Sequence, residues 1–277
     1  MKSKIVTIGN FKGGTGKTTN SCMIAYELSC MGFDTLLVDL DPQANATSLF
    51  LQTRQGQKNE VKAFDSTLMK AITENNVKSI VTDIKDNLYL LPSFADFSSY
   101  PLFLEKKFPN SQKDRIFFMK EMLEEIKDDY DYIIIDTPPT LSLFTDSAIV
   151  ASDSIVIVSQ TQERSFIGAQ AFVQYLQEFY DLYDEVDFDV AGILPVLLKN
   201  TAPVDKKILQ SIIEEFGEDN VFNNVVKNME RLKRYDLTGI VDPNINKSSD
   251  MHDKKVHKLY TELAKEFIEK VNKVGEY

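Results

Sequence analysis

The feature that most constrains the fold is a glycine-rich stretch between two segments with regular structure. Residues 5–9 form a short apolar run that predicts a strand, and residues 22–28 form an apolar segment that predicts a helix. Between them, residues 12–19 read Lys-Gly-Gly-Thr-Gly-Lys-Thr-Thr. Glycines let backbone N–H groups approach phosphate oxygens closely, and the N-terminus of a following helix favours an anion. This strand, turn and helix therefore predict a phosphate-binding loop.

The residues of this loop have distinct expected roles. The side chain of Lys17 is expected to reach the β- and γ-phosphates of a nucleotide, and the hydroxyl of Thr18 is expected to ligate Mg²⁺. The remaining expected contacts to the nucleotide come from Lys12, Gly13, Gly14, Thr15, Gly16 and Thr19. A glycine turn with an incidental lysine is the structural alternative, and the flanking strand and helix argue against it.

Two further apolar runs end in carboxylates. Residues 35–39 predict a strand that ends at Asp39, with Asp41 and Pro42 directly after it, and residues 132–136 predict a strand that ends at Asp136. Apolar runs of this kind suit strands that are covered on both faces of a parallel sheet. Ligands bind at the carboxyl edge of such sheets, so Asp136 is expected to hold Mg²⁺ through water. The predicted fold class is α/β, a doubly wound and mostly parallel sheet with helices on both faces.

The loop differs from the usual phosphate-loop pattern because Lys12 stands at its first position, where that pattern has glycine. With this lysine, residues 39–47 (Asp-Leu-Asp-Pro-Gln-Ala-Asn-Ala-Thr) and residues 136–139 (Asp-Thr-Pro-Pro) resemble the ParA/MinD superfamily, and ParA-type partition ATPases in particular. The resemblance is specific before residue 140 and weaker afterwards. It implies an ATP-sandwich homodimer in which Lys12 reaches the partner's phosphates, and slow hydrolysis in which Asp41 orients or deprotonates water. Lys12, Lys17 and Asp41 are thus the expected catalytic residues, with ATP and Mg²⁺ as cofactors.

The resemblance also implies nonspecific DNA binding and a centromere-binding partition protein that stimulates hydrolysis. A formal net charge of −11 argues against a surface that binds DNA everywhere. A local group of basic residues could still bind DNA at that net charge. The candidate DNA-binding residues form two groups in the later part of the chain: Lys199, Lys206 and Lys207, and Lys227, Arg231, Lys233 and Arg234. Ordinary solvated helix faces are the alternative interpretation of both groups.

Composition and length favour a single ATPase domain over residues 1–277, because no linker rich in Pro, Gly or Ser divides the chain. The segment before the first predicted strand is too short for a helix-turn-helix domain. The sequence shows neither a run long enough to span a bilayer nor a signal peptide, so a cytoplasmic protein is expected. The DNA binding that the resemblance implies adds the expectation that the protein is associated with the nucleoid. Cys22 and Cys30 lie on one predicted helix, and we expect both to be small buried residues without a disulfide.

The remaining pattern predicts further elements. An exposed loop is expected over residues 52–60, and an aromatic-rich loop around Phe94, Phe97, Tyr100 and Phe103 whose rings we interpret as core. Helices are predicted over residues 64–72, 115–126 and 167–183, strands over 88–91, 155–158 and 190–194, and a loop over 244–250 before a terminal helix. On the helix at 167–183, Phe166, Phe172, Tyr175, Leu176 and Phe179 are expected to pack against the protein.

Two other functions are possible from the sequence. A MinD-like membrane-positioning ATPase would need an amphipathic membrane helix at the C-terminus. The last helix carries Leu259, Leu263 and Phe267, but glutamates interrupt its basic face, so docking onto the domain is the simpler expectation. A metal-cluster ATPase would need paired cysteines after the nucleotide motifs, and Cys22 and Cys30 come too early for that.

Overall fold

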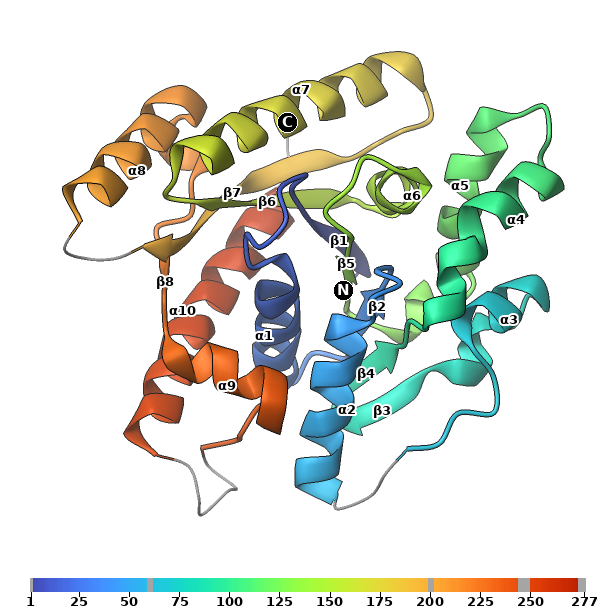
Figure 1. Ribbon diagram of the computed structural model, residues 1–277, viewed down its shortest axis with the longest axis horizontal. Coiled ribbons are helices and arrows are strands. Elements are labelled where there is room, and N and C mark those ends of the chain that lie inside the picture. The colour runs from blue at the N-terminus through green and yellow to red at the C-terminus, as the bar shows by residue number, and fades with distance from the viewer. Residues whose placement is uncertain (1, 59–61, 199–201, 244–249, 274–277) are drawn as a thin grey trace.

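The computed structural model describes residues 2–58, 62–198, 202–243 and 250–273, and within them one eight-stranded sheet forms the centre of the molecule (Figure 1). The strand order is β3-β4-β2-β5-β1-β6-β7-β8, in which β3 is antiparallel to β4 and the remaining pairs are parallel. The strands are β1 (Lys4–Gly9), β2 (Thr35–Asp39), β3 (Thr82–Lys85), β4 (Leu88–Leu91), β5 (Tyr132–Asp136), β6 (Ser154–Gln160), β7 (Asp189–Leu198) and β8 (Val226–Lys227).

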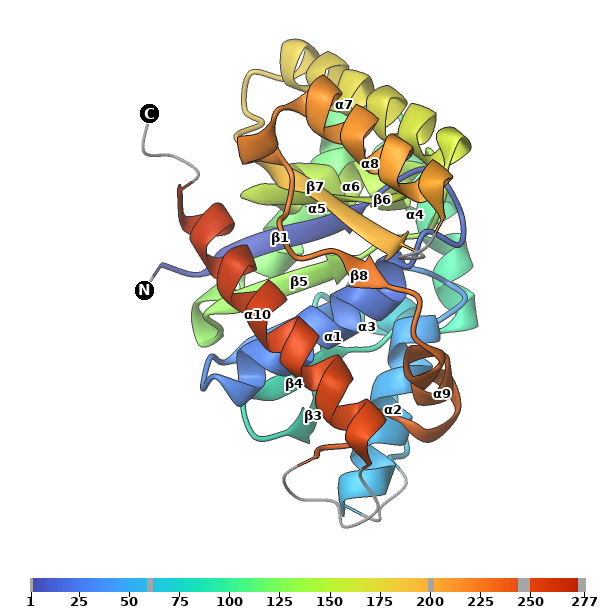
Figure 2. The same ribbon diagram turned by 90° about the vertical axis from the view of Figure 1, so that its left-hand side faces the viewer.

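Helices cover both faces of this sheet (Figures 1 and 2), which confirms the predicted fold class. One face carries α1 (Lys17–Cys30), α2 (Asn45–Lys58), α9 (Glu230–Thr238) and α10 (Met251–Lys273). The other carries α3 (Leu68–Thr73), α4 (Tyr100–Lys107), α5 (Gln112–Glu124), α6 (Leu143–Ala151), α7 (Glu163–Leu182) and α8 (Pro203–Phe216). Short 3-10 helices are η1 (Val77–Ile80), η2 (Ala95–Ser99), η3 (Lys127–Asp129) and η4 (Glu218–Asn220).

The helix α1 is buried on almost every side because it lies between the sheet and α10 (Figure 2). Its residues Cys22, Ile24 and Leu28 are fully buried, and so are Tyr260 and Phe267 of α10. This burial fixes the position of the loop that precedes α1, since the helix has little freedom to shift within a close-packed core.

Residues 52–58 are helical, so the predicted exposed loop over residues 52–60 is wrong as far as the structure describes it. The side chain of Arg54 is buried, and its Nε donates a hydrogen bond to the backbone oxygen of Asp83 (3.0 Å). Gly56 lies near α9, because an added Cβ would be 4.0 Å from the oxygen of Thr238. The segment is therefore a helix that contacts β3 and α9, although Gln55, Gly56 and Lys58 are exposed to solvent.

Other predicted boundaries also shift. The helix predicted over residues 64–72 begins at Leu68, because Thr67 caps it by accepting a hydrogen bond from the N–H of Lys70 (3.3 Å). The predicted aromatic loop is helical in η2 and α4, and its interpretation as core is confirmed by the complete burial of Phe97 and Tyr100. The helix predicted over 115–126 is α5, and the one over 167–183 is α7, whose Phe172, Leu176 and Phe179 are buried as expected.

The terminal helix α10 docks onto the domain as expected, with Val256, Leu263 and Val271 buried against it. In the part of the chain that the structure describes, no helix has the length and apolarity needed to cross a membrane. Cys22 is buried as predicted, whereas Cys30 is exposed because it ends α1 at the surface, and both are free thiols. The loop predicted over 244–250 lies outside the described residues except for Asp250.

Candidate active site

The sheet brings the loop after β1 and the carboxylates of β2 and β5 to one edge. Ile8 of β1 and Asp39 of β2 both stand in register with Asp136 of β5. The loop itself is held by Asn10, whose Nδ2 donates to the Val158 oxygen (2.7 Å) and whose Oδ1 accepts from the Lys12 N–H (2.8 Å). Parallel strands place their carboxyl ends together, so these side chains converge as the sequence predicted.

Two glycines give the loop its shape. Gly14 has φ +72° and Gly16 has φ +91°, in a region that side chains with a Cβ rarely adopt. A Cβ on Gly16 would also lie 3.3 Å from the Nδ2 of Asn20. The backbone therefore turns tightly before α1, with the N-terminus of that helix behind it.

A cavity of about 510 Å³ opens in front of this turn. The predicted loop residues Gly14, Thr15, Gly16, Lys17, Thr18 and Thr19 line it together with the predicted Asp41. Lys12 and Gly13 lie outside the lining. The sequence analysis missed Asn45, Ser48, Thr137, Pro139 and Asp236, which complete the wall. Of these, Thr137 and Pro139 lie in the Asp-Thr-Pro-Pro motif and Asn45 lies in the motif at residues 39–47, and these motifs were the available signal.

Lys17 is buried and forms no ion pair within the described residues. Its Nζ donates to the backbone oxygen of Lys12 (3.3 Å), which leaves further N–H groups of the ammonium for a ligand. Burial lowers the pKa of Lys17, while the charges of Asp136 and Asp41 oppose that change. An anion in the cavity would favour the charged ammonium.

Asp136 lies beneath the cavity and is completely buried. Its Oδ1 accepts a hydrogen bond from the Ser21 hydroxyl (2.9 Å), whereas Oδ2 has no hydrogen-bond partner among the described residues. Burial raises the pKa of Asp136, and the nearby Thr18 and Ser21 hydroxyls counteract this. A buried oxygen without a partner, beside the Thr18 hydroxyl, fits the surroundings of a Mg²⁺ ion with its water shell. The described residues contain no group of three or more acidic, His or Cys side chains that could hold a metal by themselves.

Asp39 and Asp41 have different surroundings. Asp39 is fully buried, and its Oδ2 accepts hydrogen bonds from the N–H and hydroxyl of Thr47 (2.8 Å each). Its Oδ1 accepts from the N–H of Asp41 (3.1 Å), so Asp39 holds the turn that carries Asp41. Burial and the neighbouring Asp136 raise the pKa of Asp39. Asp41 faces the cavity instead, with its Oδ1 accepting from the N–H of Gln43 (2.9 Å).

Lys12 lies on the rim of the loop beside α7. A Cβ added to Gly168 of α7 would lie 3.8 Å from the Cβ of Lys12, and the Lys12 side chain is half-buried. Lys12 is therefore placed beside α7 and outside the cavity lining.

A second cavity lies on the other side of Gly16 and Thr19. Its further lining residues are half apolar and half polar or charged. They come from α1, β8, α9, α10 and the segment before α9: Asn20, Val226, Asn228, Met229, Leu232, Lys233, Asp236 and Tyr260. Its volume is about 80 Å³, much smaller than that of the cavity in front of the loop. The sequence analysis did not predict these residues.

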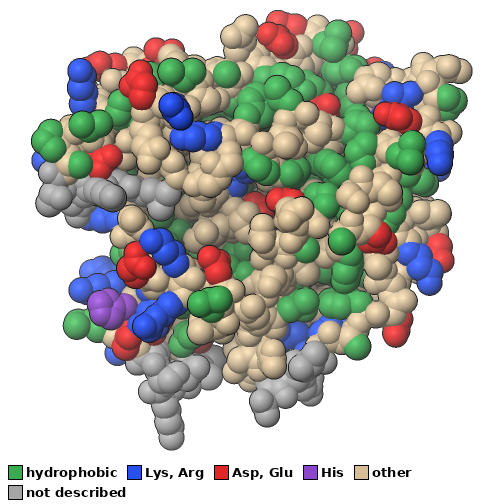
Figure 3. Space-filling view, viewed as in Figure 1, with side chains coloured by type: hydrophobic (Ala, Val, Ile, Leu, Met, Phe, Trp, Pro, Cys, Tyr) green, Lys and Arg blue, Asp and Glu red, His purple; other side chains and the backbone are tan. Residues whose placement is uncertain are grey.

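The candidate DNA-binding residues do not form one uniform patch. Lys206 and Lys207 are exposed on α8, and Lys227, Lys233 and Arg234 are exposed at β8 and α9. On the face drawn in Figure 3, acidic side chains lie among the basic ones. Lys233 pairs with Glu230 (2.8 Å). Lys199 lies outside the described residues.

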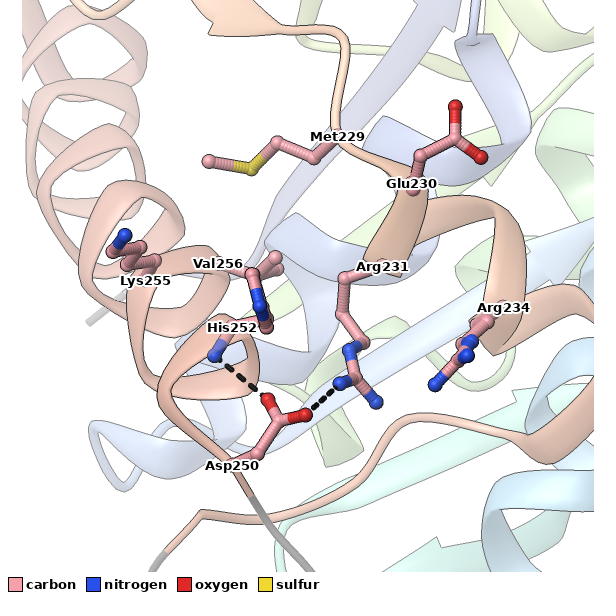
Figure 4. Close-up of a pocket in the computed structure, with 8 residues that line it drawn as sticks. All are labelled: Met229, Glu230, Arg231, Arg234, Asp250, His252, Lys255 and Val256. Carbon is pink, nitrogen blue, oxygen red and sulfur yellow. Dashed lines mark hydrogen bonds and ion pairs between the residues drawn. The ribbon is translucent and has the colours of Figure 1, made fainter.

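Arg231 differs from its basic neighbours because it is largely buried and paired. It forms ion pairs with Asp250 and with the fully buried Asp253 (3.4 Å), and 14% of its side chain is exposed. Figure 4 shows Arg231 and Arg234 of α9 facing His252 and Lys255 of α10 across a pocket of about 440 Å³. The pairing with Asp250 and Asp253 means that Arg231 fastens α9 to α10.

Comparisons with known proteins agree with this geometry. Residues 3–190 match the AAA domain family, which is more than half of the chain. The sporulation initiation inhibitor protein Soj of Bacillus subtilis is 28% identical over 268 residues, covering 95% of this chain and 97% of Soj. The chain belongs to the ParA-type ATPases of the ParA/MinD superfamily.

Solved structures share the fold of this ParA-type chain. A McdA variant from Cyanothece in complex with ATP superposes with a TM-score of 0.77 at 19% identity, covering 96% of each chain. A putative plasmid partition protein from Borrelia burgdorferi, bound to AMPPNP, gives a TM-score of 0.74 at 22% identity, covering 97% of this chain and 100% of the other.

Proposed function

We propose that this chain is an ATP-dependent partition ATPase that segregates plasmid or chromosomal DNA, acting as one domain over residues 1–277. The observation that carries the proposal is the convergence of Lys17, Thr18 and Asp41 on one cavity above the unpartnered oxygen of Asp136. The ATP and AMPPNP complexes of the two structural neighbours support a nucleotide as the ligand.

The loop residues 12–19 would hold the phosphates of ATP through backbone N–H groups and the ammonium of Lys17. Thr18 and Asp136 would hold Mg²⁺, the first directly and the second through water. The ion would offset charge on the phosphates. Its positive charge would also stabilise the ionised form of Asp136, whose pKa is raised by burial.

Hydrolysis of ATP needs a positioned water and neutralised charge more than covalent help from the protein. Asp41 faces the cavity and is held by the turn that Asp39 fixes, so it is the group that orients or deprotonates this water. The reaction is slow in the free protein, and a centromere-binding partner protein accelerates it.

Two copies would close over the nucleotides, with Lys12 of each copy reaching the phosphates of the other. The dimer then holds DNA without regard to sequence, through the exposed lysines and arginines of α8, β8 and α9, and the protein is cytoplasmic and associated with the nucleoid. The alternative, a MinD-like ATPase on a membrane, is less favoured because the apolar face of α10 is buried against α1.

The decisive experiment measures Mg²⁺-ATP binding by calorimetry, then binding of the ATP-loaded protein to random-sequence DNA and to anionic vesicles. Wild type is expected to bind ATP and DNA but not vesicles, whereas Lys17→Ala loses ATP affinity because it removes the charge facing the phosphates. Lys106→Ala, an exposed lysine on α4, is the matched control. Unchanged ATP affinity in Lys17→Ala would overturn the nucleotide site, and binding to vesicles instead of DNA would favour the membrane function.

A further inference from the structure

The C-terminal ends of α7 and α8 lie at the end of the molecule away from the phosphate-binding loop. Figure 2 shows the loop between α7 and β7 at the end of the sheet where β1 begins, and the loop after β1 at the opposite end. The helix η4 follows α8 and lies beside β7, because a Cβ added to Gly192 would lie 2.9 Å from the backbone oxygen of Asn220. The segments that follow α7 and α8 therefore form one surface.

This surface is acidic. Its exposed carboxylates, which we call the acidic surface, are Asp184, Glu185, Asp187 and Asp189 after α7 and Glu218 and Asp219 after α8. The sequence has no Lys, Arg or His over residues 165–198 or 208–226. Two basic groups reach the surface from other helices: Lys113 pairs with Glu185, and the Nζ of Lys270 donates to the backbone oxygen of Asp219 (2.7 Å). The other five carboxylates form no ion pair among the described residues.

The direction of the two helices adds to this negative charge. The C-terminus of a helix carries a partial negative charge, because its last C=O groups have no partner within the helix. Neither α7 nor α8 has a basic residue in its last turn that would offset this charge. The protein therefore leaves a negative potential at this end, which favours a cation from outside.

Apolar side chains are exposed among these carboxylates. Solvent reaches 52% of Tyr180 and 69% of Leu182 in the last turn of α7, and 36% of Val190 at the start of β7. The ring of Tyr180 packs edge-on against the buried Phe188, with 6.3 Å between the ring centres, so its position is fixed. Exposed apolar groups that gather at one place, with charged residues around them, are typical of an interaction surface.

We propose that the acidic surface binds a cationic amphipathic segment of another protein. Lysines or arginines of that segment pair with the carboxylates, and its apolar side chains cover Tyr180, Leu182 and Val190. The charge of the surface disfavours DNA and anionic membranes, and the net charge of −11 disfavours a second copy of this chain. The inference does not depend on the proposed function, because the surface lies at the opposite end from the loop after β1.

The test measures binding of a fluorescent model peptide by anisotropy at low salt and without nucleotide. The peptide has about 18 residues, Leu and Lys, spaced so that one face of its helix is apolar and the other basic. Wild type is expected to bind the peptide, with an affinity that falls as salt is added. The charge variant Asp184→Lys with Asp187→Lys should bind about 10-fold more weakly, because two attractions become repulsions.

Two matched controls separate this surface from the rest of the protein. Asp65→Lys with Glu105→Lys makes the same change in net charge at exposed acids elsewhere, and should keep the affinity within about 3-fold of wild type. The apolar variant Tyr180→Ser with Leu182→Ser should weaken binding by at least about 5-fold, because less apolar area is covered. Leu102→Ser with Leu237→Ser, exposed leucines of α4 and α9, is its control and should bind like wild type.

Four results would overturn the inference. A wild type that does not bind the peptide would reject the surface, and an equal loss in the charge variant and its control would reduce the effect to net charge. Unchanged affinity in the apolar variant would reject an amphipathic partner. Self-association of wild type without nucleotide, measured by light scattering and lost in the charge variant, would assign the surface to a second copy. A thermal unfolding curve for each variant establishes that it is folded.

Discussion

Asp39 and Asp41 stand two positions apart, yet their surroundings assign them separate roles. Asp41 faces the cavity, so Asp41→Ala should bind Mg²⁺-ATP normally while turnover falls by about 10²- to 10⁴-fold, the usual contribution of a positioned acid or base. Asp39→Ala should instead lower the free energy of unfolding by about 1–3 kcal/mol, because the N–H groups of Thr47 and Asp41 lose their acceptor. Steady-state ATPase assays measure the loss of turnover in Asp41→Ala, and urea denaturation measures the loss of stability in Asp39→Ala. Equal turnover in Asp41→Ala and wild type would show that Asp41 does not orient or deprotonate the attacking water.

Lys12 is the residue whose role depends on a second copy of the chain. Lys12→Ala should retain ATP affinity in the monomer, because its side chain lies outside the cavity lining, but should fail to dimerise. Light scattering with a nonhydrolysable ATP analogue measures this, with Lys106→Ala as the matched control. A Lys12→Ala protein that dimerises like wild type would show that the Lys12 side chain is not needed to join the two copies.

Among the elements, α10 is attached to α1 through a buried histidine. The Nδ1 of His257 lies 2.5 Å from Oε1 of Glu27 and its Nε2 lies 2.9 Å from the backbone oxygen of Val241, so both ring nitrogens face acceptors. Burial disfavours the charged ring, but the hydrogen bond and charge of Glu27 prevail and raise the pKa of His257. The neighbouring groups include Asp242, Tyr26 and Thr261, and the last of these donates to the other oxygen of Glu27 (2.8 Å).

A raised pKa in the folded state gives His257 a stabilising contribution that is present in full below its ordinary value near 6.5. That contribution is lost as the pH rises through the folded-state pKa. The free energy of unfolding of wild type minus that of His257→Gln should therefore decrease from pH 6 toward pH 9. Comparing the two proteins at each pH cancels the effect of Asp39 and Asp136, whose raised pKa values change stability with the same sign. His252→Gln, an exposed histidine, is the control, and a difference that does not change with pH would contradict the charged pairing.

The elements also show what the sequence could predict. The strands β1, β2 and β5 were predictable because each is an apolar run followed at once by its own motif, and their parallel register alone brings Asp136 beside Asp39. The second half of α2 was not, since Arg54 and Gly56 contact β3 and α9, which lie far away in the sequence. Asp236 was missed for the same reason: no local pattern marks a carboxylate that reaches the nucleotide cavity from a late helix. Local sequence motifs predicted the residues around the phosphate-binding loop. The remaining residues of the site come from distant elements, and only tertiary packing brings them there.

At the scale of the whole molecule, a protein with an acidic net charge needs a local group of cations to bind DNA. The net charge of −11 repels a duplex, so one copy should bind weakly, and a dimer that doubles the phosphates contacted should bind more tightly. Lys227 and Arg234 are exposed and form no ion pair among the described residues, whereas Lys233 pairs with Glu230 and Arg231 pairs with Asp250 and Asp253.

The double variant Lys227→Ala and Arg234→Ala should therefore lose most DNA affinity while keeping ATP binding and dimerisation. For this variant, the slope of log affinity against log salt concentration should become less steep by about 0.9 for each phosphate that is no longer neutralised. The reason is that fewer counterions are released on binding. Arg231→Ala should instead lower the free energy of unfolding by about 3–5 kcal/mol, since it leaves Asp253 buried without its cation. Fluorescence anisotropy with random-sequence DNA across a salt series measures the first effect, and Lys106→Ala with Lys107→Ala on α4 is the matched control. If the double variant binds DNA with the wild-type salt slope, the DNA-binding surface lies on α8, where Lys206 and Lys207 are the next residues to replace.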